Sequence, residues 1–205
     1  MRDGIDRLVA AVIAGVAGAA LVLQLVLILR NPGSPLALVV RYFSFFTILS
    51  NIVVTGVCIA VALGRGWLRS PVARGAAALY IAVTAGIYAA LLQGLVHLAG
   101  AGVLADDLLH KVVPALYVVA WLACAPHRLL RWTDVLRWLL FPLVYIGWVL
   151  LRGAVVHEYP YPFLDLTKSA GGVVAVHCVA MGVLFALLGL VLVAADRFIP
   201  ARRRH

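Results

Sequence analysis

Six long apolar runs make up most of this chain and leave few folds open to it. They cover about residues 8–29, 42–63, 75–98, 108–125, 135–151 and 170–195. A helix that crosses a bilayer needs roughly 20 mostly apolar residues. The runs are continuous rather than alternating, which argues against an eight-stranded barrel. With 65% hydrophobic and 12% charged residues, the sequence predicts an all-α integral membrane protein, a six-helix bundle that forms one domain over residues 1–205.

The distribution of positive charge predicts how these helices are oriented. All but five of the 17 Lys and Arg residues fall on one side of a six-span arrangement. Because loops rich in Lys and Arg stay in the cytoplasm, we expect both termini there, in a multi-pass protein of the plasma membrane. The expected partners are therefore lipids or lipid-like substrates and not nucleic acid. The five basic residues on the outer side are Arg30, Arg41, Lys111, Arg152 and Lys168.

A stripe of polar residues interrupts the second apolar run. Ser44, Thr47 and Asn51 are spaced at i, i+3 and i+7, which an α-helix places on one face. Polar groups inside a membrane are costly unless partnered, so this face is expected to point at protein or a cavity. Simple packing is the alternative, because Ser and Thr in membrane helices often bond the carbonyl four residues back.

The predicted topology brings other polar residues into the same outer half. His110 follows Asp106 and Asp107 by four and three residues, so either carboxylate can hold its imidazole from one helix face. An imidazole oriented by a third group can activate a Ser or Thr hydroxyl as a nucleophile. His177 lies roughly 10 Å below the start of the sixth run. Four basic residues on the outer side are candidates to bind a substrate carboxylate or an oxyanion. Alternatively, they extend to the lipid headgroups. They are Arg41, Lys111, Arg152 and Lys168.

Metal binding has less support in the sequence. Several His and Asp residues share the outer side, but no compact ligand motif such as H-E-x-x-H is present. The three cysteines lie singly within apolar runs and have no metal-like spacing. We therefore expect neither a metal nor a cofactor.

Three segments carry a resemblance to a known family. They are RYFSFFTILSN from Arg41 to Asn51, HKVVP from His110 to Pro114, and YPFLD from Tyr161 to Asp165. In order and placement the chain resembles the androgen-induced and androgen-dependent transmembrane hydrolases, and more closely their six-helix bacterial relatives. The animal members are intramembrane threonine hydrolases that cleave fatty acid esters of hydroxy fatty acids.

The resemblance implies a lipid-ester hydrolase with Ser44 as nucleophile and His110 as base. The chain differs from the animal pattern in two ways: the nucleophile position holds serine, and Thr47 replaces an acid one turn later. Thr47 is therefore the alternative nucleophile. Thr47, Asn51, Asp106, Asp107 and His177 are the supporting or alternative residues. Two other classes remain open, a small transporter or channel and a non-catalytic lipid-binding membrane protein.

Overall fold

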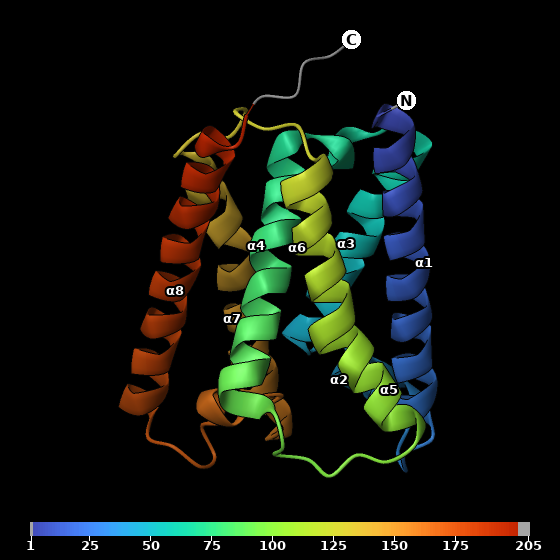
Figure 1. The fold of residues 1–205 in the computed structure, drawn as a ribbon. Helices are drawn as coiled ribbons and strands as arrows, with labels where there is room; N and C mark the ends of the chain where they lie inside the picture. The colour runs from blue at the N-terminus through green and yellow to red at the C-terminus, as the bar shows by residue number, and fades with distance from the viewer. Residues whose placement is uncertain (1, 201–205) are drawn as a thin grey trace. The chain divides into compact units, whose positions relative to one another are not determined.

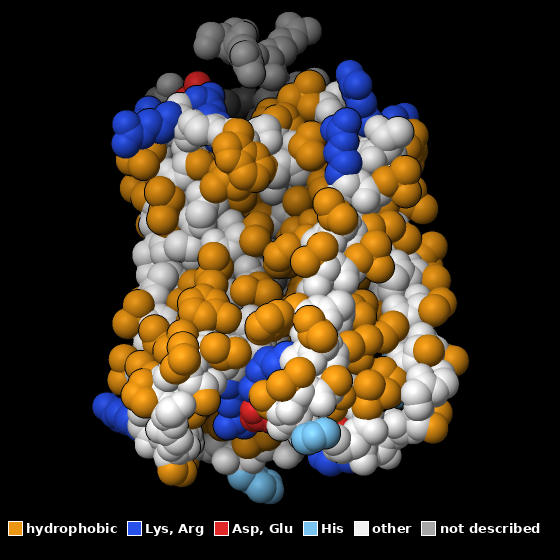
Figure 2. Space-filling view, turned by 180° about the vertical axis from the view of Figure 1, so that it is seen from behind, with side chains coloured by type: hydrophobic (Ala, Val, Ile, Leu, Met, Phe, Trp, Pro, Cys, Tyr) orange, Lys and Arg blue, Asp and Glu red, His pale blue; other side chains and the backbone are white. Residues whose placement is uncertain are grey.

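A computed structural model describes residues 2–200, which are mostly helical with no strand in that range (Figure 1). Large apolar side chains stay exposed along the helices, while Lys and Arg gather near helix ends (Figure 2). Such apolar surface is unfavourable in water and favourable in lipid. Six described helices are long and apolar enough to cross a membrane, as the sequence predicts: Asp3–Leu29, Phe46–Leu63, Pro71–Leu92, Ala101–Cys124, Asp134–Val156 and Gly171–Phe198. They indicate a multi-pass membrane protein.

Contacts group the described chain into two compact units, and the single domain stays a prediction. The first unit comprises residues 2–129 with 197–200, and the second comprises residues 130–196. In the first unit, α1 and α4 each pack against both α3 and α6, and the short helices α2 and α5 pack against α1 (Figure 1). The bounds are α1 Arg2–Leu29, α2 Pro35–Phe43, α3 Phe46–Leu63, α4 Pro71–Ile87, α5 Ala101–Asp107 and α6 Val113–Cys124.

The second unit contains two long helices and the segment that joins them. These are α7 (Asp134–Val156) and most of α8 (Gly171–Phe198), with the short 3₁₀ turn η4 (Pro162–Leu164) between them. The backbone N–H of Leu130, just before α7, donates to the Asp196 carboxylate near the end of α8 at 3.0 Å.

The second predicted span is divided, which corrects the expectation of one helix over residues 42–63. A Ser-Pro pair starts the extra helix α2, with the Ser34 hydroxyl accepting from the Ala37 N–H and Pro35 in the first turn. Helix α2 ends at Phe43 with Ser44 as its C-cap, and Phe45 is extended with φ −90° and ψ 127°. Ser44 therefore does not share a helix with Thr47, and the predicted three-residue stripe is wrong at its first member.

The connection between the third and fourth spans also lies earlier than predicted. The third span ends at Leu92 instead of residue 98, and the fourth begins at Ala101 instead of residue 108. Gly94 and Gly100 have positive φ values of 82° and 56°, which suit glycine and favour an irregular connection over residues 93–100. As a consequence, Asp106 lies inside the fourth span, one helical turn before His110.

The hydroxyl of Tyr42 anchors α2 to α1. It donates to the carbonyl of Leu21 at 2.8 Å, and both residues belong to one buried apolar cluster with Ile48 and Leu109. This contact fixes the chain immediately before Ser44 and α3.

The turn that follows η4 in the second unit is expected to depend on pH. The Asp165 carboxylate accepts from the hydroxyl and the backbone N–H of Thr167, and Lys168 lies 3.4 Å away. These contacts, led by the Thr167 hydroxyl, lower the pKa of Asp165. A lowered pKa adds stability above the pKa of the unfolded chain, and this is lost as pH falls below about 4.

Amide hydrogen exchange at Thr167, corrected for the intrinsic pH dependence of exchange, measures this effect. Protection is expected to fall as the pH is lowered through that range, and Asp165→Asn should show the low-pH protection at neutral pH. Equal protection of both proteins at neutral pH would contradict the assignment.

Candidate active site

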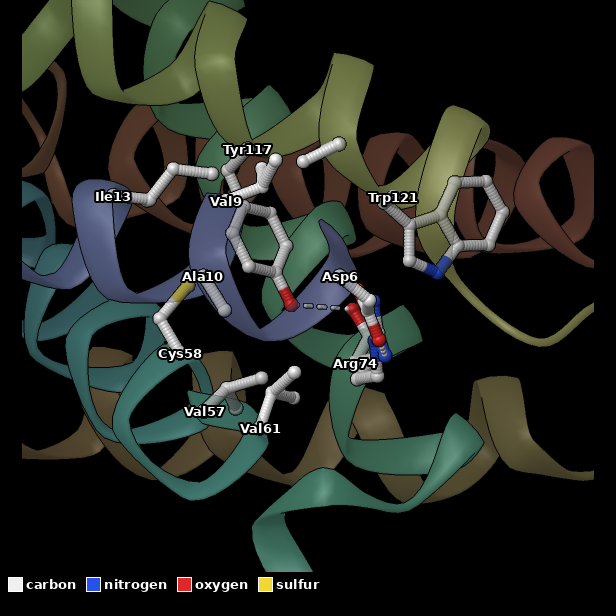
Figure 3. A pocket seen from close by; sticks show the side chains of 11 residues that line it. Asp6, Val9, Ala10, Ile13, Val57, Cys58, Val61, Arg74, Tyr117 and Trp121 are labelled. Carbon is white, nitrogen blue, oxygen red and sulfur yellow. Dashed lines mark hydrogen bonds and ion pairs between the residues drawn. The ribbon is translucent and has the colours of Figure 1, made fainter. Parts of the chain in front are cut away.

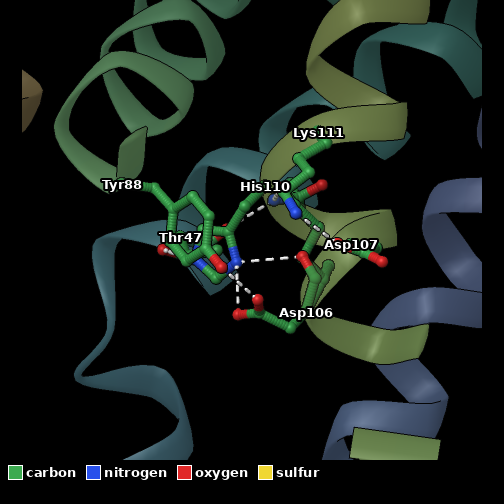
Figure 4. A network of polar contacts seen from close by, with 8 residues as sticks. Thr47, Tyr88, Asp106, Asp107, His110 and Lys111 are labelled. Carbon is green, nitrogen blue, oxygen red and sulfur yellow. Dashed lines mark hydrogen bonds and ion pairs between the residues drawn. The ribbon is translucent and has the colours of Figure 1, made fainter. Parts of the chain in front are cut away.

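Thr47, His110 and Asp106 form a connected chain of polar contacts in the first unit (Figure 4). The Thr47 Oγ1 atom lies 3.1 Å from His110 Nε2, and His110 Nδ1 lies 3.0 Å from Asp106 Oδ1. Thr47 comes from the first turn of α3, whereas the other two residues belong to the fourth span. The arrangement has the connectivity of a hydroxyl, an imidazole and an orienting carboxylate.

The contacts of His110 determine which of its ring nitrogens carries the proton. Nδ1 lies 3.0 Å from both the carboxylate and the backbone carbonyl of Asp106, and these oxygens are acceptors. Nδ1 must therefore be the donor, which leaves Nε2 of the neutral ring with a lone pair. The Thr47 hydroxyl then donates to Nε2, which is the direction of proton transfer that a general base requires.

Tyr88 completes this cluster and is the member that sequence reasoning missed. Its hydroxyl donates to Asp106 Oδ2, and its ring stacks on the His110 imidazole with centroids 4.1 Å apart and an interplanar angle of 16°. The Lys111 Nζ atom lies 5.9 Å from the same ring. Tyr88 is an isolated aromatic residue in an apolar run, and its partner Asp106 is 18 residues away, so no local pattern marks it.

Two π-helical turns flank the cluster. They are η2 (Tyr88–Leu92) at the end of α4 and η3 (Leu108–Val112) between α5 and α6. In each, a backbone N–H donates to the carbonyl five residues back: Gln93 to Tyr88 at 2.8 Å, and Val113 to Leu108. Single π-helical turns inside α-helices occur frequently at functional sites. Here the two turns hold Tyr88 and His110, which stack on each other.

Ser44 and Asn51 have different contacts from Thr47. The Ser44 hydroxyl is fully buried and donates to the Val40 carbonyl four residues back at 2.7 Å, the bond that the packing interpretation predicts. The Asn51 Nδ2 atom donates to the carbonyls of Thr47 at 2.8 Å and Leu109 at 3.2 Å. Of the two candidate nucleophiles, Thr47 is therefore the one paired with His110.

Three of the four candidate cations face carboxylates. Lys111 lies 2.6 Å from Asp107 Oδ1 and is about half exposed. In the second unit, Arg152 pairs with Glu158 at 2.8 Å, and Lys168 is the Asp165 partner described above. Arg41 is exposed in the last turn of α2. Asp107 therefore partners Lys111, and it is Asp106 that holds the histidine.

His177 belongs to the second unit and makes its contacts there. Its Nδ1 atom lies 2.8 Å from the backbone carbonyl of Phe163, which identifies Nδ1–H as the donor. The ring also meets the Phe163 ring edge-on at 6.5 Å between centroids. This histidine ties α8 to η4. Within residues 2–200, no group of three or more His, Cys, Asp or Glu residues is placed to hold a metal ion.

A second polar cluster lies at the other end of the first unit, around Asp6, Arg74 and Tyr117 (Figure 3). The Arg74 guanidinium binds both carboxylate oxygens of Asp6 at 2.8 Å, and the Tyr117 hydroxyl donates to the Arg74 carbonyl at 3.1 Å. They border a pocket of about 10 Å³, the lower limit for one water molecule. The contacts tie α1, α4 and α6 together.

Comparisons with models of protein families, with curated proteins and with solved structures find no match to this chain.

Proposed function

We propose that the chain is an intramembrane lipid-ester hydrolase in which Thr47 is the nucleophile and His110 the base. The observation that carries this proposal is the 3.1 Å contact between Thr47 Oγ1 and His110 Nε2, with Asp106 on the opposite nitrogen. A threonine hydroxyl is a weak nucleophile until a base takes its proton. The geometry supplies that base in the required tautomer and fixes its orientation.

The reaction would proceed through a covalent acyl-enzyme. Thr47 Oγ1 attacks the ester carbonyl carbon while its proton moves to His110 Nε2, and Asp106 stabilises the resulting imidazolium. The tetrahedral intermediate collapses, and the alcohol leaves with the proton from Nε2. Water then attacks the acyl-Thr47 ester with His110 again as base, which releases the acid. Because Thr47 is in the first turn of α3, the helix dipole favours the negative charge that develops on the substrate oxygen.

The substrate class follows from the surroundings of the site and from the family resemblance. The cluster lies in spans whose outer surface is apolar, so an ester with acyl chains would approach it from the bilayer. Lys111, about half exposed beside Tyr88, is the candidate to bind the carboxylate of a fatty acid ester of a hydroxy fatty acid. In this proposal the termini are cytoplasmic, the protein lies in the plasma membrane, and the site lies in the outer half of the bilayer.

Labelling with a fluorophosphonate probe tests the nucleophile. In detergent micelles the probe is expected to form one adduct, which peptide mass spectrometry should locate on Thr47. Thr47→Ala should abolish the adduct, whereas Ser44→Ala, which removes the neighbouring buried hydroxyl, should retain it. An adduct on Ser44 would transfer the role to the residue that the family resemblance indicates. Undiminished labelling of both variants would overturn the proposal.

A transporter or channel is the alternative function, and flux measurements distinguish it. Carriers coupled to protons usually bury carboxylates in their spans. Asp106 lies within the fourth span, and its side chain is only 20% exposed. Its contacts with Tyr88 and His110 would then be a proton path. Flux into proteoliposomes that persists in Thr47→Ala but is lost in Asp106→Asn would favour transport over hydrolysis.

A further inference from the structure

The π-helical turn that carries His110 leaves one backbone carbonyl without its usual donor. Within this turn the Val113 N–H donates to the Leu108 carbonyl, five residues back. The next donor in that series would be residue 114, and it would bond the carbonyl of Leu109. Residue 114 is proline, which has no N–H. A buried carbonyl without a donor is costly, so Leu109 needs a partner from elsewhere.

Asn51 supplies this missing donor from α3. Its Nδ2 atom bonds the Leu109 carbonyl at 3.2 Å and the Thr47 carbonyl at 2.8 Å. One amide nitrogen therefore joins the residue that carries the candidate nucleophile to the residue immediately before His110. Both partners are acceptors, which fixes the orientation of the amide.

The other end of the Asn51 amide shows that this bridge has a cost. The side chain is fully buried, and its Oδ1 atom has no hydrogen-bond partner. A leucine of similar size would fill the same space without an unsatisfied oxygen. The position is thus poorly explained by packing, and well explained by the two bonds that the nitrogen makes.

We propose that Asn51 is a positioning residue that holds the turn Leu108–Val112 in its π-helical form and so keeps His110 in register with Thr47. If the turn relaxed to a regular α-helix, residues on one side of it would shift by one position, about 100° around the helix axis. His110 would then leave the Thr47 hydroxyl. The expected effect on the labelling rate rests on the proposed function. The expected effect on the position of His110 rests on the geometry alone.

Two substitutions at position 51 test the bridge. Asn51→Ser keeps a hydroxyl that can bond the Thr47 carbonyl four residues back but is too short to reach Leu109. Asn51→Leu removes both bonds and fills the space. Both are expected to lower the rate of fluorophosphonate labelling about 10²-fold, because a displacement of about 1 Å has an effect of that size. The ¹⁵N NMR signals of His110, measured in micelles, are expected to lose the pattern of a protonated Nδ1 with Nε2 accepting a hydrogen bond.

Ser50→Ala is the matched control. Ser50 is also fully buried and donates to the Thr47 carbonyl at 3.1 Å, but its second contact is Thr84 of α4 and not the π-helical turn. Its loss should leave the His110 signals unchanged and reduce labelling by no more than a few-fold.

Pro114→Ala provides a rescue that a merely structural role would not show. Alanine at position 114 restores an N–H that can bond the Leu109 carbonyl, so the effect of Asn51→Ser on the His110 signals should be smaller in that background. Equal effects in both backgrounds, or wild-type signals in Asn51→Ser and Asn51→Leu, would overturn the inference. If the wild-type chain takes no label, the proposed function fails while the NMR comparison still decides the role of Asn51.

Discussion

His110→Ala is expected to lower the rate of fluorophosphonate labelling and of lipid-ester hydrolysis by about 10³-fold or more. Removal of the histidine from a catalytic triad has effects of at least this size, since the hydroxyl then has no base. In this chain Nε2 of His110 lies 3.1 Å from the Thr47 hydroxyl and is its proposed base. Initial rates with purified protein in micelles, at equal concentrations of folded protein, measure the change.

His97→Ala is the control for this prediction. His97 is exposed on the connection over residues 93–100, outside both π-helical turns, so its replacement should leave the rate unchanged. Labelling of His110→Ala at the wild-type rate would show that the contact seen between Thr47 and His110 has no catalytic role. An equal loss in both variants would point to damage to the fold.

The number of spans could be predicted from the sequence because it depends on a long-range property, the length of continuous apolar runs. The ends of the spans depend on local hydrogen bonds, and these were harder to predict. Ser44 bonds the Val40 carbonyl and ends α2, although the apolar run continues through it. Likewise, an apolar segment continues to Leu98 after the helix has ended at Leu92.

The candidate site could be predicted only in part, for a similar reason. The spacing of Asp106 and His110 is local, and their predicted contact is present in the structure. The choice between Ser44 and Thr47 as nucleophile depends on the break in the helix at Phe45. This break rotates one side chain relative to the other, and the helical spacing of polar residues gives no sign of it. The place of Tyr88 in the site and the bridging role of Asn51 both depend on contacts between spans. Tyr88 and His110 are 22 residues apart, and Asn51 and Leu109 are 58 residues apart. The π-helical turn contains one residue more than a regular α-helical turn would. The spacing of His110 and Pro114 in the sequence does not reveal this.

The same limit applies to the ion pair at the opposite end of the first unit. Asp6 and Arg74 are 68 residues apart, so no local pattern in the sequence marks their contact. In the structure their side chains are only 20% and 9% exposed, with two hydrogen bonds of 2.8 Å between them. Asp6→Ala is expected to lower the free energy of unfolding by about 3 kcal/mol, because it leaves the guanidinium buried without its carboxylate.

Equilibrium unfolding in mixed micelles, followed by far-ultraviolet circular dichroism, measures this loss of stability. Asp3→Ala is the control, because Asp3 is an exposed acid one turn earlier in the helix. The double variant Asp6→Leu/Arg74→Met separates two explanations of a loss. If the main penalty is the unpaired charge, replacing both partners by apolar residues should cost less than Asp6→Ala alone, since a well-packed apolar pair can equal a buried ion pair. If instead the two costs simply add, the pair contributes no mutual stabilisation.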